Sequence, residues 1–580
     1  MLRSPWIRMC SAPLRWTQRY PWGYGASMSE ITLIHIGDLH GHLLPRPNLR
    51  SGAAARSEGG LARMAALIDR IRAERPDSLL VNTGDTIQGG AEALFTRGRA
   101  LVDAVDRLGV DLYAPGNWDY LYGKERFLEL FGEGTGPRGV GHRWGALAAN
   151  AYHDGSDSLL LPPRRVPEVG GLRVGVVGLS SERAINALGP WVTRGIRFTA
   201  DAAEIPAHVR ALREQERVDL VVLISEFGLA KNILIAERNP GIDVVLSSDM
   251  HEETHEPVVT STGALVSEAG QDGTRVAQLD LRVEAGRIAD WSYRLHAVDD
   301  SVPEDPAMAA AIREVREPFV AGPGFLPHTD PMSGARLKRP IDQVVGRTTI
   351  ALHRSEPSHP EAAPDARAAV VSGTSHDFLS AALRHAAGAD IGHMRGFRYG
   401  THIAPGDIRL EDLFHLMPVG AQLARGLVTG AQVLQQLQAG ANGALDPDPF
   451  RWTGGWLHAH AGLRYALDPG AAAGSKVSRV EVRRAGGEEW TPLEPDAAYS
   501  VAGYWFAEAP QQVGGLACTD IEVLRTADGR PRDVTEHVVD VLREHPVEPE
   551  PERIALQAPL PPRTGPNAEI QPLRGGASAR

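Results

Sequence analysis

Short polar clusters follow several apolar, β-branched runs of the sequence, and their side chains are of types that bind metals. GDLHGH, NTGD, PGN, SEFG and SSDMH each stand where such a run ends. They supply four carboxylates, two imidazoles and an amide: Asp38, His40, Asp85, Asn117, Glu226, Asp249 and His251. The set suffices for two metals about 3.5–4 Å apart, which can hold a tetrahedral anion and activate water at neutral pH. The alternative is that each Asp or Asn only caps a turn or helix.

The last cluster overlaps HEETH at residues 251–255, which matches the H-E-x-x-H signature of zinc proteases. That signature works on a helix, where two histidines four residues apart share one face. Here the apolar run IDVVL comes shortly before it and Pro257 follows it, so we predict the end of a strand. A strand-end metal site, or a chance match in a loop, is favoured over a protease. His255 is expected to neighbour the site without binding metal.

The segments that must position these clusters have the pattern of an α/β layered domain. Strands are predicted in ITLIHIGD, SLLVNTGD, DLYAPGN, LRVGVVGL, DLVVLIS and IDVVLSSD. Helices are predicted between them, for example in LARMAALIDRIRAER, where apolar residues recur at helical spacing. Because open α/β sheets build their sites at the carboxyl ends of strands, the clusters are expected to meet there.

The 580 residues allow two or three domains. We predict a catalytic domain over 28–298, a linker with a short helix over 299–339, and a second domain over 340–545. That domain has helix patterns in HDFLSAALRHAA and AQVLQQLQAGA and strand patterns in VSRVEVRRA and AYSVAGYWF. The Pro-, Gly- and Glu-rich segment 546–580 is predicted to be disordered.

Composition excludes several classes of protein. The 43% hydrophobic and 23% charged residues are typical of soluble globular proteins, and the net charge of −12 argues against a nucleic-acid polymer as partner. Cys10 and Cys518 are too few for a disulfide scaffold or a cysteine zinc site. No apolar run approaches the roughly 20 residues of a membrane span, so we expect no membrane partner, and we expect a monomer.

The first 27 residues lack the apolar stretch of about 7–15 residues that a secretory signal needs. A second start-like residue, Met28, immediately precedes the patterned sequence. We therefore expect residues 1–27 to be disordered or to lie upstream of the true start, and the protein to be cytoplasmic.

The order D-x-H, G-D, G-N, strand-end group and x-x-H resembles that of the calcineurin-like metallophosphoesterases. It is most similar to their long branch with a second domain, the 5′-nucleotidases and the SoxB thiosulfohydrolases. The resemblance implies a layered β-sandwich flanked by helices, followed by an α+β domain of 5′-nucleotidase type. It implies two metal sites that share Asp85, one with Asp38, His40 and His251, the other with Asn117, Glu226 and Asp249.

Two departures from the family concern the second metal. Where relatives have histidines, this chain has Glu226 and Asp249, which leaves only oxygen ligands. Such ligands suit Mn²⁺, Mg²⁺ or Ca²⁺ better than Zn²⁺, and we expect two Mn²⁺ ions. The alternative is a degenerate relative that has lost one metal, since four carboxylates offset the formal charge of two divalent ions.

A third departure concerns the leaving group. Phosphoesterases of this type have a histidine after the asparagine, whereas this chain has Trp118 in PGNWD, as SoxB-type enzymes do. A general acid helps an alkoxide to leave, whereas a sulfur anion of low pKa needs less help. The resemblance implies a catalytic group formed by Asn117, Trp118, Asp119 and Arg398. The alternative is that Trp118 only packs beneath the site.

Motifs of the second domain also resemble SoxB, above all RGFRYGT at 395–401, DPDPFRWTGGWLHAHAGLRYALDP and YSVAGYWF. Arg398 is expected to bind two oxygens of a sulfonate or phosphate, with Arg395 and Tyr399 as further substrate-binding residues. The nucleotidase motifs P-F-G-N and G-G-D-G are not evident, and neither are base-stacking aromatics. WLHAH at 456–460 is expected to be an alternating strand face and not a third metal site.

Three hypotheses about function follow. The leading one is a two-metal hydrolase that releases sulfate from a cysteine-S-thiosulfonate on a sulfur-carrier protein. The runner-up is a 5′-nucleotidase-type phosphomonoesterase acting on a small anionic ester. The third is a catalytically degenerate relative that binds a carrier protein or anion. The SoxB-like family is usually exported, which is in tension with the expected cytoplasmic location.

Overall fold

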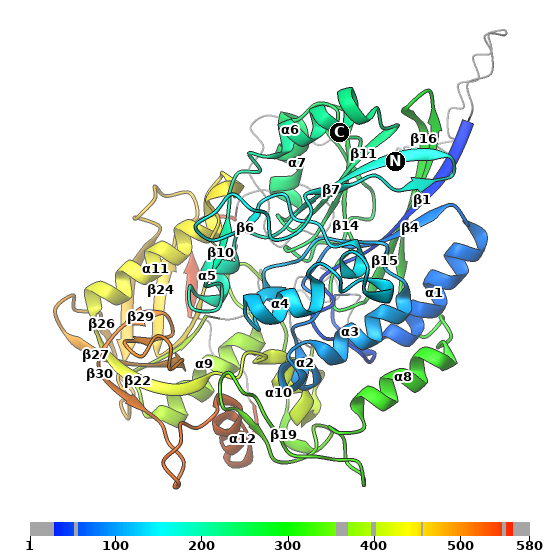
Figure 1. The fold of residues 1–580 in the computed structure, drawn as a ribbon. Coiled ribbons are helices and arrows are strands. Elements are labelled where there is room, and N and C mark those ends of the chain that lie inside the picture. The colour runs from blue at the N-terminus through cyan, green and yellow to red at the C-terminus, as the bar shows by residue number, and fades with distance from the viewer. Residues whose placement is uncertain are drawn as a thin grey trace, which may run out of the picture.

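The structure is a computed structural model, and it describes residues 28–50, 56–354, 369–395, 402–453, 456–547 and 553–560. Residues 1–27 lie outside the described part of the chain, and so do the predicted substrate-binding residues Arg398 and Tyr399. Figure 1 shows helices packed around sheets in both halves of the described chain.

The first sheet of the N-terminal half has five strands in the order β16-β15-β1-β4-β5. These are β1 (Met28–Ile36), β4 (Ser78–Asn82), β5 (Leu112–Tyr113), β15 (Arg275–Glu284) and β16 (Arg287–Ala297). β1, β4 and β5 are parallel, whereas β15 pairs with β1 in the antiparallel sense. The predicted strands ITLIHIGD, SLLVNTGD and DLYAPGN are therefore neighbours, and their carboxyl ends share one edge.

The second sheet is built on four parallel strands: β9 (Leu172–Leu179), β11 (Leu220–Ser225), β12 (Val244–Ser247) and β14 (Leu265–Glu268). Short strands flank them: β7 (Arg164–Arg165), β8 (Glu168–Val169) and β13 (Val258–Val259). Every residue of β11 and β12 is buried. This explains their continuous apolar sequence, because a parallel sheet is covered on both faces.

The two sheets pack face to face, with helices on their outer faces. Leu33 and Val81 of the first sheet pack with Val222 and Val244 of the second. Alternate residues of the same strands point outward, where helices cover them. The covering helices include α1 (Leu61–Glu74) and α3 (Arg99–Val105) on the first sheet and α6 (Ile205–Arg210) and α7 (Leu229–Arg238) on the second. The predicted α/β sandwich flanked by helices is confirmed.

The C-terminal half contains a five-stranded and a four-stranded sheet. The first has β20 (Ile391–Met394), β22 (Gln422–Thr429), β23 (Ala459–Ala461), β27 (Ala498–Trp505) and β30 (Thr519–Val523). The second has β24 (Leu463–Leu467), β25 (Val477–Arg483), β26 (Trp490–Pro492) and β31 (Ile554–Leu556). The helices predicted in this half are present as α9 (Thr374–Ala387) and α11 (Gly430–Leu445). α11 begins at Thr429, whose hydroxyl accepts a hydrogen bond from the backbone N–H of Gln432.

The short helix predicted within residues 299–339 is present as α8 (Pro306–Arg316), which packs against α1 and α3. The predicted tail, in contrast, contains a strand. β31 lies in the segment predicted to be disordered, and it pairs in parallel with β24. Its backbone hydrogen bonds come from a strand far away in the sequence, so local composition did not indicate it.

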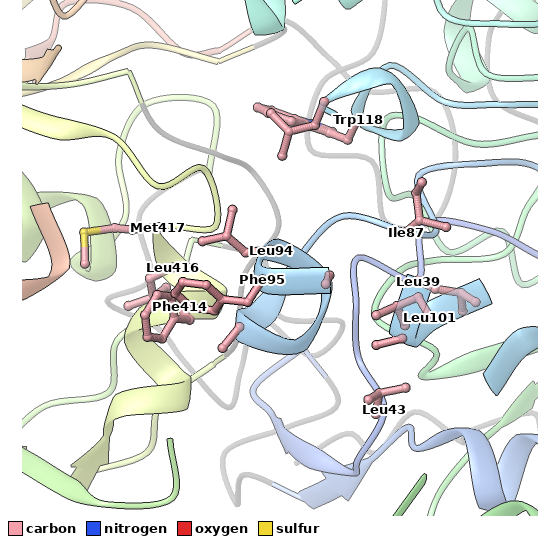
Figure 2. Packing of buried hydrophobic residues seen from close by; sticks show 14 of the residues in the cluster. Leu39, Leu43, Ile87, Leu94, Phe95, Leu101, Trp118, Phe414, Leu416 and Met417 are labelled. Atoms are coloured by element: carbon pink, nitrogen blue, oxygen red, sulfur yellow. The ribbon is translucent and has the colours of Figure 1, made fainter. Parts of the chain in front are cut away.

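The two halves are joined by an apolar contact and by an ion network. Figure 2 shows Leu94 and Phe95 of α2 (Gly90–Thr96) beside Phe414 and Leu416 of α10 (Leu410–Leu416). The rings of Phe95 and Phe414 lie 5.5 Å apart, edge to face. Close by, the guanidinium of Arg316 lies 3.0 Å from the carboxylate of Glu92 and 2.7 Å from that of Glu411.

Arg46 completes this network, because it lies 3.2 Å from Glu411 and 2.7 Å from Asp412. Burial alone would raise the pKa of Glu411, but the Arg46 and Arg316 guanidinium groups hold it below its ordinary value. The network therefore stabilises the folded chain while Glu411 is ionised.

We predict that Arg316→Leu lowers the free energy of unfolding by about 3–5 kcal/mol, because it leaves two buried carboxylates without their shared cation. Since the pKa of Glu411 is lowered in the folded state, its contribution is present above the ordinary value of 4.5. The difference between variant and wild type should therefore shrink as the pH falls below that value. Urea unfolding followed by circular dichroism measures both effects.

The matched control is Arg313→Leu, which removes an exposed arginine of the same helix. It should change the free energy of unfolding by less than about 0.5 kcal/mol. Equal effects of the two variants would contradict a specific role for the network.

Candidate metal centre

The predicted ligands lie where the carboxyl ends of the two sheets meet. Asp38 follows β1 and Asp85 follows β4, whereas Glu226 directly follows β11 and Asp249 follows β12. HEETH is not helical, since His251–His255 form a loop after β12. The prediction of a strand end is confirmed, and the geometry of a helical zinc-protease motif is absent there. His255 is half exposed, and its ring lies 3.9 Å from the carboxylate of Glu253.

Five of the seven predicted ligands form two groups whose ligand atoms lie within 4.8 Å of one another. One consists of Asp38, His40 and His251, and the other of Asp38, Asp85 and Glu226. The Nε2 atoms of His40 and His251 are 3.1 Å apart, and that of His40 is 3.8 Å from the carboxylate of Asp85. Asp38 thus belongs to both groups, whereas the family resemblance implied that Asp85 is shared.

Burial and mutual repulsion dominate the electrostatics of this centre. Burial raises the pKa of Asp38, Asp85 and Glu226 well above their ordinary values, and the neighbouring carboxylates raise it further. The Oε2 atom of Glu226 is buried and has no hydrogen-bond partner among the described residues. Carboxylates this close remain ionised at neutral pH only beside cations. The donor set therefore fits divalent metal ions.

The loops that present these ligands have unusual backbone conformations. Positive φ angles occur at five of the predicted ligands: Asp38, His40, Asp85, Asp249 and His251. Each such residue costs of order 1–3 kcal/mol unless its surroundings impose the conformation. For the loops after β1 and β4, two hydrogen bonds hold this conformation, from the Asp38 N–H to Gly84 O (3.0 Å) and from the His40 N–H to Asp85 O (2.8 Å).

Two glycines allow these loops to touch. Gly41 has a φ of +71°, and a Cβ there would lie 1.7 Å from the carbonyl oxygen of Gly89. No side chain can be accommodated at that distance. The GDLHGH and QGG stretches are thus adapted to hold the two metal-binding loops in contact.

The predicted catalytic residues after β5 have different surroundings. Asn117 and Trp118 line a cavity beside Asp85 and His251. The Trp118 backbone N–H donates to the Asp85 carboxylate at 2.8 Å. Asp119 instead accepts from the backbone N–H groups of Thr86, Ile87 and Gly116, so it fixes the loops.

The cavity has a volume of about 550 Å³ and lies between the two halves of the chain. Its aromatic lining comes from distant segments: Tyr122, Trp191, Trp456, Tyr504 and Phe506. Its polar lining includes Arg183, His393, Arg395 and His458. Arg395, a predicted substrate-binding residue, donates to the carbonyl oxygen of Asn186 across the cavity wall. The arrangement suits a substrate with an anionic group at the metals and an apolar body.

The two histidines of WLHAH have different surroundings: His458 lines the cavity, whereas His460 lies in the second half's own sheet. His460 of β23 stands opposite His393 of β20, and their ring nitrogens are 3.1 Å apart. Burial lowers the pKa of His460 to about 4, so the pair is uncharged at neutral pH.

Sequence reasoning missed two residues near the candidate ligands. Glu268 ends β14, and its carboxylate accepts from the backbone N–H groups of Met250 and Glu252, which fixes the loop of His251. Arg183 follows β9 and forms a buried ion pair with Asp249. Both stand at the carboxyl ends of strands, so the rule that found the ligands could also have found them.

Residues 31–253 match the family model described as calcineurin-like phosphoesterase, and residues 344–514 match that of the 5′-nucleotidase C-terminal domain. The chain belongs to the calcineurin-like phosphoesterases that carry a 5′-nucleotidase C-terminal domain. It is thus a metal-dependent hydrolase by family, and the predicted resemblance is confirmed. None of the helices in the described residues is long and apolar enough to cross a membrane.

Similar proteins include both branches of the predicted family. A probable 5′-nucleotidase of Treponema pallidum is 26% identical over 529 residues, covering 81% of this chain and 84% of that protein. The solved sulfate thiohydrolase SoxB of Thermus thermophilus superposes with a TM-score of 0.74 at 23% identity, over 93% of this chain and 98% of SoxB. A 5′-nucleotidase precursor of the same species gives a TM-score of 0.71 at 23% identity, over 91% of this chain and 100% of the precursor. These structures share the fold.

Calcineurin-like phosphoesterases bind two divalent metal ions, and the two groups of converging ligands fit that number. Asn117 lies beside them in the cavity wall. Mn²⁺ as the metal, and Asn117 and Asp249 as ligands, stay predictions.

We predict that Asp38→Asn loses both metals, because Asp38 belongs to both groups, whereas Glu226→Gln loses one. Wild-type protein should hold about two equivalents, and each lost carboxylate should weaken binding by about 100-fold or more. Elemental analysis after dialysis and calorimetric titration with Mn²⁺ measure these values. Asp69→Asn, at an exposed position of α1, is the control and should retain both metals. Equal metal content in all three variants would contradict the assignment.

Proposed function

We propose that this hydrolase releases sulfate from a thiosulfonate carried on a cysteine of a carrier protein, as SoxB-type enzymes do. The likeness to the SoxB fold supports the proposal, as do the motifs of the second domain. The observation that carries it is the side chain that follows Asn117.

Trp118 is nine-tenths buried and lines the cavity beside Asp85 and Asn117. An indole ring donates no proton to a departing alkoxide. The next residue, Asp119, accepts three backbone hydrogen bonds and does not line the cavity. The segment after Asn117 therefore favours a leaving group that departs as an anion, which a persulfide does and an alkoxide does not.

The proposed reaction is R–S–S–SO₃⁻ + H₂O → R–S–S⁻ + SO₄²⁻ + 2 H⁺. A water oxygen bonds to the sulfonate sulfur, the S–S bond breaks, and the persulfide sulfur keeps the electron pair. When bound, divalent ions would polarise the sulfonate oxygens and lower the pKa of water. Asp38, Asp85 and Glu226 would hold these ions, together with His40 and His251. Arg395, which lines the cavity, would pair with the anionic group of the substrate.

A 5′-nucleotidase-type phosphomonoesterase is the second candidate. The aromatic lining of the cavity favours it, because Trp191 and Phe506 lie 5.7 Å apart and could stack on a base. The similarity to the probable 5′-nucleotidase of Treponema pallidum also supports this candidate.

We predict that Mn²⁺-loaded protein releases sulfate and persulfide in equal amounts from a peptide bearing a cysteine-S-thiosulfonate. It should release phosphate from nucleoside monophosphates at least about 100-fold more slowly, because no proton donor follows Asn117. Ion chromatography measures sulfate and phosphate. Faster release of phosphate would favour the second candidate, and no release of either would favour a binding relative.

We further predict that Trp118→His raises hydrolysis of alkyl phosphates by about 10–100-fold, because imidazole can protonate the leaving alkoxide. Hydrolysis of p-nitrophenyl phosphate, whose leaving group needs no proton, should change little. Trp118→Phe, which removes the indole without adding an acid, is the matched control for steady-state kinetics. The same rates in the His and Phe variants would refute the role assigned to this position.

A further inference from the structure

Arg183 stands at the metal centre without being part of the family's ligand pattern. It precedes α5 (Ala184–Leu188), in the loop after β9. Its Nη1 atom donates to the Asp249 carboxylate and lies 3.1 Å from the Met250 sulfur. The side chains of Arg183 and Asp249 are only 8% and 5% exposed. A buried ion pair thus lies where a second metal ligand was predicted.

Asp249 lies near the converging ligands, and its charge raises the pKa of Asp38, Asp85 and Glu226, but its side chain is paired with Arg183. It belongs to neither group of ligand atoms that approach within 4.8 Å. Its backbone N–H points at the Asp38 carboxylate, at 3.2 and 3.3 Å from the two oxygens. The loop is thereby fixed to the metal centre through its backbone, while the side chain holds Arg183.

Arg183 retains unused hydrogen-bonding capacity. Its Nε and Nη2 atoms are buried and have no hydrogen-bond partner in the part of the chain that the structure describes. The adjacent Glu182 is paired with Lys231 and does not compete for it. Arg183 also lines the cavity next to Asp85, Asn117 and His251. A buried guanidinium with open donors is matched by the oxygens of a tetrahedral anion.

We propose that Arg183, oriented by Asp249, binds the oxygens of the substrate's anionic group, and that Asp249 is not a metal ligand. Arg183 is then a substrate-binding residue and Asp249 a positioning residue. The ligand class is a sulfonate or phosphate oxyanion. The proposal does not depend on which leaving group the enzyme accepts. Metal content and oxyanion binding therefore test it independently of the proposed thiosulfonate substrate.

The first test is metal content. We expect Asp249→Asn to keep the metal equivalents of wild-type protein, whereas Glu226→Gln loses about one equivalent. Elemental analysis and Mn²⁺ titration measure this without any substrate. Loss of one equivalent in Asp249→Asn would overturn the assignment, because Asp249 would then be a ligand.

The second test is binding of inorganic phosphate and of sulfate to the metal-loaded protein, measured by calorimetry. Arg183→Gln should weaken binding by about 10–100-fold, the range expected for losing charge-assisted hydrogen bonds. Arg183→Lys keeps the charge but lacks the planar guanidinium, so its affinity should lie between those of wild type and Arg183→Gln. Asp249→Asn should also weaken binding, because the guanidinium loses its anchor.

The control is Arg194→Gln, which removes an exposed arginine of the segment that follows α5. It should bind phosphate as wild type does. Wild-type affinity in both Arg183→Gln and Arg183→Lys, with metal content unchanged, would overturn the proposal. Thermal melting identifies a variant that fails to fold. If Arg183→Gln does not fold, the phosphate affinity of Arg183→Lys tests the proposal instead, because lysine preserves the ion pair with Asp249.

Discussion

Repulsion between buried carboxylates is the constraint on which the rest of the structure depends. Asp38, Asp85 and Glu226 converge within 4.8 Å at the edge where the two sheets meet. Metal ions offset this repulsion, but the fold must hold the side chains together before metal binds. The parallel strands and the loops with positive φ hold these side chains in place. The backbone N–H groups of Trp118 and Asp249 also donate to the carboxylates of Asp85 and Asp38.

The second half of the chain is coupled to this centre through the segment that follows Asp85. α2 carries Glu92 and Phe95, which contact Arg316 and Phe414 respectively. Gly89, which immediately precedes α2, touches the loop of His40. Leu94 and Phe95 of the same helix lie beside α10 of the second half (Figure 2). The cavity is lined by residues of both halves, so the contact between the halves brings its two walls together.

Local sequence was sufficient to find residues that converge at one edge, because a polar residue after an apolar run marks the end of a strand. Asp38, Asp85 and Glu226 were found in this way, and parallel pairing then placed them together. Features that depend on distant segments were not accessible to such reasoning. The pairing of Arg183 with Asp249, the aromatic wall from Trp191 to Phe506, and β31 in a Pro-rich tail each arise only when separate segments meet.

The pairing of Arg183 with Asp249 also bears on the substitution of histidine by acids. With Asp249 as a ligand, four carboxylates would cancel the formal charge of two divalent ions and leave no net attraction for an anion. When Asp249 pairs with Arg183, its negative charge is neutralised by the guanidinium. The remaining three carboxylates then leave a centre with two divalent ions with a net positive charge. A substrate oxyanion would then meet both metals and a fixed guanidinium in a buried site, where charge interactions are strong. An acid at this position is thus compatible with anion hydrolysis when an arginine accompanies it.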